Sequence, residues 1–424
     1  MAYQPCLLLV ALIALLNGVN ARYVVQHNRV PELSLVKDTT HVTLAFMRSE
    51  VFNEDDPLEW PLFTSVDAVR SEFAPGTAVM VAIGGWGDTQ GFSVAAATEA
   101  SRKRFAANVK AMVDATGADG VEIDWEYPGG NGEDYKQVPN SAKAWEVDAS
   151  PKLLAEIRSA LGPDKLISAA VPGLRRDMIA FTPGTAPQID QSLDFWNIMT
   201  YDLMNRRDNV TKHHAGVVEA LDAIDAYLER GVPADKGNLG FPFYVKWFRT
   251  DPKSNCDGHP VGCKTVLLED PVTGADLRQA GASCWADGVP PELATSYARA
   301  MKYGKYDLER GGHYYWVADG GIFWSWDTPD SSARKFAIMN MRKLGGVFAW
   351  GLGGSKTTFA KREKMNFELV DMPCIQRFTS QRTSDANPFA PLYMHNMHDR
   401  ELDGQTFHPS HIALSTWQML QTAA

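Results

Sequence analysis

Three carboxyl side chains stand at every second position of the segment 119–128 (DGVEIDWEYP), namely Glu122, Asp124 and Glu126. Because side chains of a strand point alternately to its two faces, this pattern predicts a strand with the carboxyls on one face, about 6 to 7 Å apart at their Cα atoms. Like charges this close raise one another's pKa, so we expect one carboxyl to keep its proton at neutral pH. A protonated Glu126, at the end of the strand, could act as a general acid. An exposed strand with ordinary acidic residues is the alternative, which the apolar opposite face disfavours.

Three other apolar runs also end in residues that could serve a binding site. Segment 82–87 reads AIGGWG, segment 199–202 reads MTYD and segment 346–351 reads GVFAWG. The glycines of the first segment let the backbone approach the carboxyl-bearing strand closely. That segment also fits the start of a dinucleotide loop, but Gln90 stands where the third glycine of the loop would be, which disfavours a nucleotide site.

These four segments resemble motifs of glycoside hydrolase family 18, the chitinases. Segment 119–126 resembles the family's Asp-x-x-Asp-x-Asp-x-Glu, with Glu122 in place of the middle Asp. Segment 82–85 resembles Ser-x-Gly-Gly with Ala in place of Ser, and segment 199–202 matches Met-x-Tyr-Asp. Trp350 matches the tryptophan that floors the sugar site. The resemblance covers residues 22 to about 355, and the chain is similar to the secreted fungal members.

The resemblance implies a role for each matched residue. Glu126 would protonate the leaving oxygen and later activate water, Asp124 would stabilise the acetamido nitrogen, and Tyr201 would hydrogen-bond the acetamido oxygen. Glu122 would share a proton with the next carboxyl, and Asp119 would be structural. The implied sugar contacts are Gly84, Gly85, Trp86, Gly87, Tyr127, Met199, Thr200, Asp202 and Trp350.

The resemblance also implies a retaining mechanism in which the substrate's own N-acetyl carbonyl attacks the anomeric carbon. No metal or cofactor takes part in that mechanism. The pairs His395-x-x-His398 and His408-x-x-His411 have metal-like spacing, but no acidic or cysteine partner is evident, so we interpret them as surface residues. Trp247 is a weaker candidate for a sugar contact.

Eight short apolar runs alternate with longer helical patterns from residue 22 onward. The runs are 22–25, 41–47, 78–84, 120–126, 166–171, 193–200, 237–241 and 345–350. Continuous apolar character is typical of parallel strands covered by helices, which segments 101–116, 150–161 and 216–230 would supply. The pattern predicts an α/β fold, a (β/α)8 TIM barrel that gathers its working residues at the C-terminal ends of the strands. An open doubly wound sheet is the alternative.

The interval 243–344, between the seventh and eighth strands, is far longer than one crossover needs. It must contain an inserted subdomain, about 243–320, and the resemblance implies a small α+β insertion that walls one side of the cleft. The catalytic barrel with its insertion would span 22–370. Residues 371–424 would form a C-terminal extension packed on the barrel.

Residues 1–21 predict a cleaved signal peptide, because an apolar run too short to span a bilayer precedes small residues and a cut after residue 21. The mature protein would be secreted and extracellular. Once Cys6 leaves with the signal, the remaining cysteines are Cys256, Cys263, Cys284 and Cys374. An even count in a secreted chain favours two disulfides with three possible connectivities, of which a short Cys256–Cys263 loop is the one we expect.

The 424 residues include 41 basic and 51 acidic ones, for a net charge of −10. This charge disfavours nucleic acid and anionic membrane as partners. We expect a monomeric chitinase that hydrolyses β-1,4-linked N-acetylglucosamine polymers or oligomers. The alternatives are a chitin-oligomer-binding protein with weak turnover and an endo-β-N-acetylglucosaminidase acting on N-glycan cores. The extra methylene of Glu122 would mistune the carboxyl row and slow turnover, since coupled carboxyls titrate as a set.

Overall fold

The computed structural model describes residues 18–25, 36–55, 57, 59–284 and 289–351. The predicted extension 371–424, with Cys374 and the four spaced histidines, lies outside the described residues, as does most of the predicted signal peptide. Those expectations stay predictions. Within the described ranges, no helix has the length and apolar character that crossing a bilayer requires.

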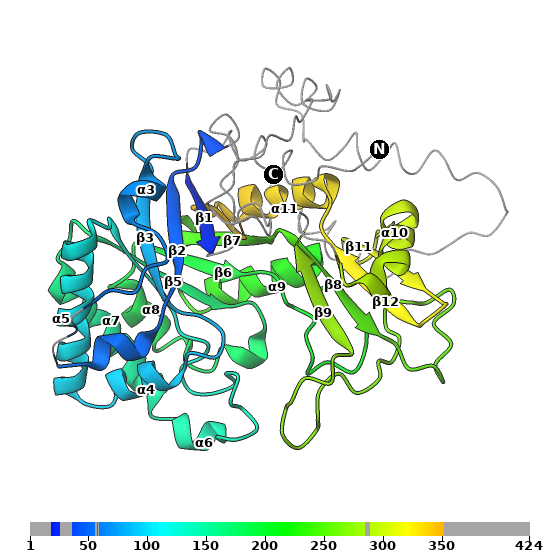
Figure 1. Cartoon of the computed structure of the whole chain (residues 1–424), viewed down its shortest axis with the longest axis horizontal. Coiled ribbons are helices and arrows are strands. Elements are labelled where there is room, and N and C mark those ends of the chain that lie inside the picture. Colours follow the sequence, from blue (N-terminus) through cyan, green and yellow to red (C-terminus); the bar gives the residue numbers. More distant parts are fainter. Residues whose placement is uncertain (1–17, 26–35, 56, 58, 285–288, 352–424) are drawn as a thin grey trace. The chain divides into compact units, whose positions relative to one another are not determined.

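Eight parallel strands close into a barrel in the order β1-β13-β7-β6-β5-β4-β3-β2 (Figure 1). The strands are β1 Val19–Val25, β2 His41–Met47, β3 Ala78–Gly84, β4 Gly120–Asp124, β5 Leu166–Pro172, β6 Phe195–Met199, β7 Gly237–Pro242 and β13 Gly346–Trp350. β1 pairs with both β2 and β13, which closes the ring and rules out the open sheet. The predicted TIM barrel is therefore confirmed.

The first strand begins at Val19, earlier than the range 22–25 that the sequence indicates. Asn20 donates its backbone N–H to the Thr40 hydroxyl at 2.7 Å and its side-chain amide to the Asp38 carbonyl at 2.8 Å. A cut after Ala21, which is buried, would remove this part of β1. The predicted cleavage position and the strand thus compete for the same residues.

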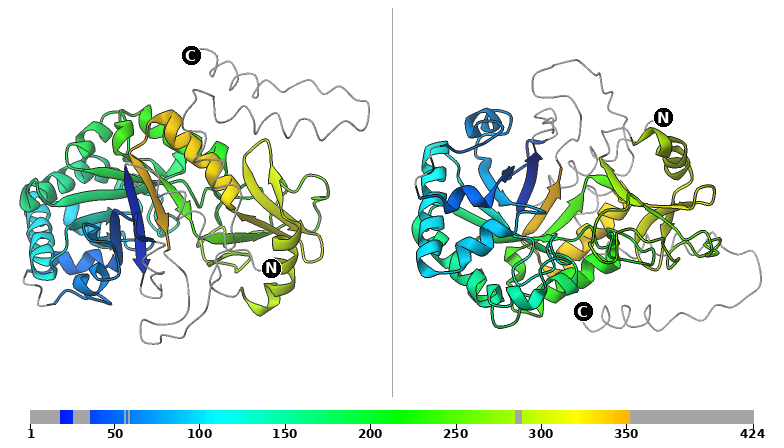
Figure 2. Two further views of the ribbon diagram at one scale, coloured as in Figure 1. Left: turned by 90° about the horizontal axis from the view of Figure 1, so that it is seen from above. Right: turned by 60° about the horizontal axis from the view of Figure 1, so that its bottom comes forward.

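Helices cover the outside of the barrel (Figures 1 and 2). The helices of this part of the chain, including short ones in its loops, are η1 Ser49–Asn53, α3 Val66–Arg70, α4 Gln90–Ala96, α5 Glu99–Thr116, α6 Asn140–Lys143, α7 Glu146–Leu161, η2 Arg175–Asp177, α8 Ala186–Asp190, α9 Val217–Leu228, η3 Ala234–Lys236 and α11 Pro329–Arg342. The boundaries of α5 have local causes. A capping box between Thr98 and Ser101 starts it, and Gly117, with a left-handed φ of 71°, ends it.

The largest hydrophobic core lies between the strands and these helices. β4 contributes Val121 and Ile123 to it, and Trp125 just beyond the strand stacks on Phe92 of α4 with 5.3 Å between ring centroids. Since successive strand side chains alternate in direction, the positions between these apolar residues face the inside of the barrel. The packing of one face against helices therefore decides where the carboxyls point.

An inserted subdomain separates β7 from β13. Its five-stranded antiparallel sheet has the order β10-β11-β12-β8-β9. The elements are β8 Tyr244–Arg249, β9 Ala280–Cys284, η4 Pro291–Leu293, α10 Ala294–Tyr303, β10 Lys305–Asp307, β11 Gly312–Val317 and β12 Ile322–Trp326. The predicted α+β insertion is present, and its sheet continues past the expected end near residue 320.

One of the two predicted disulfides joins Cys256 to Cys263, as expected. The other would have to pair Cys284 of β9 with Cys374. Because Cys374 is outside the described residues, that pairing stays a prediction.

Candidate active site

The predicted carboxyl row lies at the C-terminal end of β4. Glu122 and Asp124 are buried, and Glu126, just after the strand, is partly exposed. Glu122 contacts side chains from β1, β2 and β6, none of which neighbours β4 in the ring, so these contacts cross the barrel interior. The carboxyls thus share one face, as predicted, and that face is the inside of the barrel.

Glu122 is the most enclosed of the three carboxyls. The hydroxyl of Tyr23 donates to its Oε1, the amide of Asn197 donates to both of its oxygens, and the hydroxyl of Thr43 lies 3.4 Å from Oε2. Burial raises the pKa of Glu122 to about 8, against the opposing effect of the Asn197 bond. Glu122 is therefore mostly neutral at pH 7 and fixed in place.

Burial sets the proton affinity of the rest of the row. Burial raises the pKa of Asp124 well above its usual range, and the charges of Glu126 and Glu122 add to that shift. The pKa of Glu126 is raised to about 7, mainly by burial. The charge of Asp202 contributes to this increase, and the charge of Arg207 opposes it. A carboxyl that keeps its proton near neutral pH was expected. We expected repulsion between the carboxyls to be the main cause, and this was wrong. Removal of the carboxyls from water has the larger effect on their pKa values.

The glycines after β3 allow the backbone to approach this row closely. A Cβ on Gly84 would lie 2.2 Å from the carbonyl oxygen of Asp124, and a Cβ on Gly85 would lie 2.8 Å from the ring of Phe46. The Gly85 N–H donates to the same Asp124 carbonyl at 2.8 Å. The close approach predicted from the glycines is present, and larger side chains would prevent it. At Gly87 a Cβ would meet open space, although φ is 87°.

Tyr201 and Asp202 follow β6 and reach the same mouth. Asp202 accepts a hydrogen bond at 2.7 Å from the Tyr244 hydroxyl and another at 3.0 Å from the Lys246 ammonium. Partial burial works against its ionisation, but the Lys246 charge, the nearby His214 and the bond from Tyr244 hold the pKa of Asp202 below its usual range. Tyr201 is buried beside Tyr244, edge to face at 6.3 Å. Asp202 is therefore a fixed anion near carboxyls whose pKa values are raised.

Two further predicted contacts, at the end of β6 and just after it, have roles within the barrel. The Thr200 hydroxyl donates to the Gly240 carbonyl at 2.7 Å and accepts from the Gly240 N–H at 3.0 Å, which ties β6 to β7. This hydroxyl is already engaged, so it has no donor left for a sugar. Met199 belongs to a cluster of nearly buried side chains inside the barrel.

The predicted aromatic contacts lie on two sides of the mouth. Trp350 ends β13, which is opposite β4 in the ring of strands, and it stacks on Phe46 at 5.5 Å. On the other side, Trp86 follows β3 with 48% of its surface exposed, and its ring is 6.4 Å from that of Tyr127. Rings at these two positions bracket the carboxyl row.

Arg207 is a site residue that sequence reasoning missed. Its guanidinium lies 3.9 Å from the ring centroid of Tyr135 and 5.5 Å from that of Trp86. It also donates to the carbonyls of Asn131 and Gly132, each at 2.9 Å. The residue connects the loop after β6 with the loop after β4. A basic residue five positions past the segment 199–202 carries no signal of this contact, because the partners are about 75 residues away in sequence.

A bridge between two loops borders the same side of the mouth. The loop after β4 sends Tyr135 to the Glu269 carboxylate, Lys136 to the Pro271 carbonyl at 2.8 Å and Gln137 to the Thr273 carbonyl at 2.7 Å. We call these contacts, between residues 135–137 and 269–273, the rim bridge. It joins the loop after β4 to the inserted subdomain.

Three other expectations differ in outcome. Asp119 accepts hydrogen bonds at 2.7 Å from the Arg70 side chain and from the Val79 N–H, which is a structural role. Trp247 is buried in the core of the inserted sheet, so the expected sugar contact was wrong, because alternation along β8 points this side chain away from the site. Among the described residues, no group of three or more potential metal ligands is gathered.

Comparison with known proteins gives matches over most of the described chain. The model for glycosyl hydrolases family 18 matches residues 20–354. "Chitinase 1" of Aphanocladium album is 28% identical over 289 residues, covering 66% of this chain and 62% of that protein. "Chitinase B" of Serratia marcescens is 27% identical over 337 residues, covering 66% and 64%. The match therefore spans less than two thirds of the length of these relatives.

Solved structures show the same fold. A chitinase from Rhizomucor miehei has a TM-score of 0.62 at 21% identity, with 79% of this chain and 95% of that chain covered. A chitinase mutant from Cycas revoluta, solved in complex with (GlcNAc)4, has a TM-score of 0.59 at 20% identity, with coverage of 79% and 95%.

Proposed function

The chain belongs to glycoside hydrolase family 18, and on that premise we propose that it hydrolyses β-1,4 bonds in chitin or chitooligosaccharides. One observation carries the proposal: Glu126 is a partly exposed carboxyl with a pKa of about 7 at the end of β4, opposite the Trp350 ring. A proton donor at such a place can serve a bond held across the mouth. The relatives named as chitinases support the choice of substrate.

The mechanism we propose is substrate-assisted and retaining. Glu126 gives its proton to the glycosidic oxygen while the N-acetyl carbonyl oxygen of the preceding sugar attacks the anomeric carbon. Asp124 accepts from the acetamido N–H, and its Oδ1 is buried with no hydrogen-bond partner among the described residues. Tyr201 donates to the acetamido oxygen. Water, deprotonated by Glu126, then opens the intermediate, so two inversions leave the configuration unchanged.

The alternative nucleophile near Glu126 is the Asp202 carboxylate, which is close enough to raise the pKa of Glu126. Its Oδ1 accepts from both Tyr244 and Lys246. A carboxylate that is paired with an ammonium and held by two donors is a weak nucleophile. This arrangement favours the substrate's own carbonyl as the attacking group.

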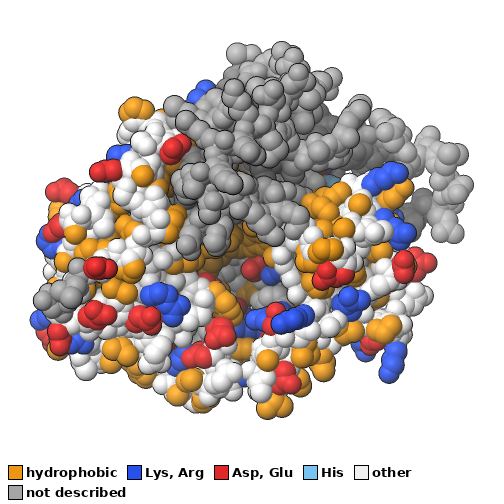
Figure 3. Space-filling model, viewed as in Figure 1, with side chains coloured by type: hydrophobic (Ala, Val, Ile, Leu, Met, Phe, Trp, Pro, Cys, Tyr) orange, Lys and Arg blue, Asp and Glu red, His pale blue; other side chains and the backbone are white. Residues whose placement is uncertain are grey.

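The proposal includes secretion, supported by the apolar segment within residues 1–21. Acidic and basic side chains are interspersed over the described part of the face in Figure 3, with no continuous basic surface there. An uncharged polysaccharide suits such a surface better than a nucleic acid does.

Time-resolved product analysis on chitin hexamer tests the activity, and proton NMR before mutarotation tests the mechanism. We expect shorter oligomers to form and the β-anomer to appear first. Early α-anomer would exclude the substrate-assisted route. No products from hexamer, with release of high-mannose glycans from a glycoprotein, would instead identify an endo-β-N-acetylglucosaminidase.

A second candidate function, retention of chitin oligomers with weak turnover, is favoured by the enclosure of Glu122. Its two oxygens accept from Tyr23 and Asn197. A carboxyl held this way moves a proton to Asp124 less readily than a mobile one. Tight binding of chitin hexamer with slow product formation would identify this function.

A further inference from the structure

A pocket lies in the inserted subdomain, lined by residues of 257–260, 299–305 and 314–319, and we call it the outer pocket. It has a volume of about 460 Å³, within the range of ligand sites. It lies along β11 and the turn that follows it, between α10 and the loop closed by the disulfide. β11 starts at Gly312 beside His213, in the loop after β6, and runs outward from there. No carboxyl of the proposed catalytic row lines this pocket.

Aromatic side chains from both faces of β11 line this outer pocket. Tyr314, Tyr315 and Trp316 are consecutive on β11 and all three are partly exposed. Tyr314 and Trp316 pack against the cluster that contains Phe323, whereas Tyr315 packs on the opposite face against the cluster that contains Trp324. The Trp316 indole N–H donates to the Thr250 hydroxyl at 3.1 Å, and that hydroxyl donates to the Gly321 carbonyl at 3.0 Å. These bonds fix the plane of the tryptophan before any ligand arrives, which lowers the entropy cost of binding.

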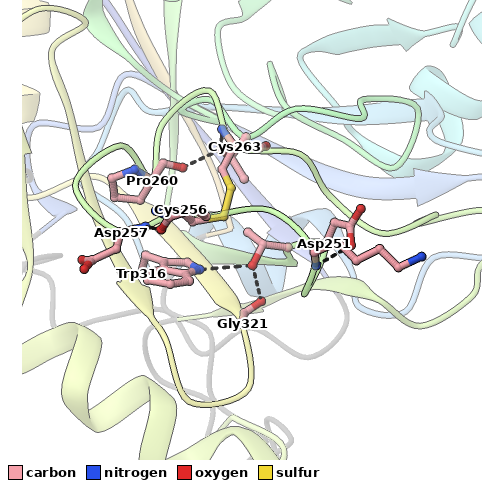
Figure 4. The surroundings of a disulfide bond; sticks show 11 residues. Asp251, Cys256, Asp257, Pro260, Cys263, Trp316 and Gly321 are labelled. Atoms are coloured by element: carbon pink, nitrogen blue, oxygen red, sulfur yellow. Dashed lines mark hydrogen bonds between the residues drawn. A yellow bond between two sulfur atoms is a disulfide. The ribbon is translucent and has the colours of Figure 1, made fainter.

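The disulfide loop forms the facing wall (Figure 4). Cys256 and Cys263 close it, and Asp257 and Pro260, which line the pocket, lie between them. The Thr211 hydroxyl donates to the Pro260 carbonyl at 2.5 Å and accepts from the Cys263 N–H at 2.9 Å. A covalent link and two hydrogen bonds therefore hold this wall beside the indole.

The charged groups of the outer pocket are balanced in number. Arg299 and Lys305 line it on one side, and Asp257 and Asp319 supply two carboxylates. Arg299 and Asp319 are 3.9 Å apart. Paired charges of this kind give little net attraction for an ion, but they offer donors and acceptors to a neutral ligand with many hydroxyl and amide groups.

We propose that the outer pocket is a second carbohydrate-binding site, which takes a segment of a β-1,4-N-acetylglucosamine chain. The sugar rings of such a chain have flat apolar faces, and their edges carry hydroxyl and acetamido groups. These features match a pocket lined by aromatic rings and balanced polar groups. The identity of the sugar rests on the proposed function, whereas a carbohydrate as the ligand class rests on the pocket itself. The site would hold the polymer without taking part in the reaction.

The experiment compares the full chain with Trp316→Ala and with the double variant Asp257→Ala/Asp319→Ala, whose positions are exposed. Retention on insoluble chitin is measured for each, beside hydrolysis of soluble chitin tetramer. Trp145→Ala is the matched control, because Trp145 has 43% of its surface exposed and lies on the barrel before α7. Circular dichroism and thermal unfolding check that each variant is folded.

We expect both pocket variants to retain chitin about tenfold less well, as loss of a central contact does, with tetramer hydrolysis within about twofold of the parent. Trp145→Ala should behave like the parent in both assays. Parental retention by the double variant and by a folded Trp316→Ala would overturn the proposal, as would an equal loss in the control. If Trp316→Ala does not fold, the double variant alone decides. Failure of the parent to cleave tetramer would count against the proposed function and leave the retention comparison valid.

Discussion

Asn197 of β6 donates its side-chain amide to both carboxyl oxygens of Glu122, at 3.1 and 3.2 Å. The side-chain amide of Asn238 on β7 in turn donates to the side-chain Oδ1 of Asn197 at 2.9 Å. The side-chain amide of Asn197 therefore has one possible orientation. All three side chains are fully buried. The position of Glu122 is therefore determined by strands that do not neighbour β4 in the barrel, and not by its neighbours in the carboxyl row.

Replacement of Glu122 by Gln should make stability less dependent on pH. A carboxyl with a pKa of about 8 when folded and about 4.5 when unfolded binds more protons in the folded state. Its contribution to the free energy of unfolding is therefore complete below about pH 4.5. This contribution falls by about 1.4 kcal/mol per pH unit as pH rises toward about 8. Urea unfolding at about pH 5, 6.5 and 8 spans this window. The free energy of unfolding should decline less steeply with pH for Glu122→Gln than for the parent. Equal slopes would contradict this, and Glu99→Gln on the exposed face of α5 is the control.

Replacement of Glu122 by Asp should raise turnover while lowering stability. The shorter side chain draws the carboxyl back toward β4 by about 1.5 Å, toward Asp124 and away from Asn197 and Tyr23. Two buried donors then lose an acceptor, at a cost of about 1 to 3 kcal/mol in the free energy of unfolding. We expect the turnover number on soluble oligomers to rise about threefold, or ~0.65 kcal/mol, with binding unchanged. A slower variant would show that the barrel has adapted to glutamate.

Glu126→Gln should remove nearly all turnover and keep oligomer binding. The amide has almost the same shape but no acidic proton, and loss of a general acid costs about 10² to 10⁴ in rate. Single-turnover kinetics on chitin hexamer and calorimetric binding are the two measurements. A turnover number within about tenfold of the parent would be a smaller loss than removal of a general acid causes. It would reject Glu126 as the proton donor.

The basic limb of the pH profile should report Glu126 and respond to Arg207. The acid form is required, so kcat/KM should fall as pH rises through about 7, the pKa of Glu126. The positive charge of Arg207 lowers this pKa, so Arg207→Met should move the limb to higher pH by roughly half a unit to one unit. Arg206→Met is the control, because Arg206 pairs with Asp276 at 3.2 Å. The same shift in both variants would indicate a general charge effect.

Two substitutions at Tyr135 separate the parts of the rim bridge. Tyr135→Phe keeps the ring against Arg207 and removes the bond to Glu269, whereas Tyr135→Ala removes both. A cation–π contact contributes about 0.5 to 2 kcal/mol, so we expect KM for long oligomers to rise about three- to tenfold in the Ala variant and much less in the Phe variant. Equal effects would assign the role to the Glu269 bond.

Local patterns in the sequence are sufficient to predict the barrel strands and the carboxyl row. Alternation over segment 119–126 and continuous apolar runs such as 78–84 depend only on neighbours along the chain, and the closed barrel places them as expected. Gly84 and Gly85 also indicate a special backbone conformation from sequence alone, because the φ values of 111° and 93° at these positions favour glycine.

The tertiary structure alone decides the electrostatics and the partners. Burial raises the pKa of Glu126, and burial depends on the whole barrel. The partners of Glu122 and Asp202, such as Asn197 and Lys246, come from strands distant in sequence, and no local period records them. Trp247 shows the same limit, because alternation tells that two faces differ but not which face meets the core. The sequence thus determines which chemical groups are present and on which strands, and long-range packing determines their protonation and contacts.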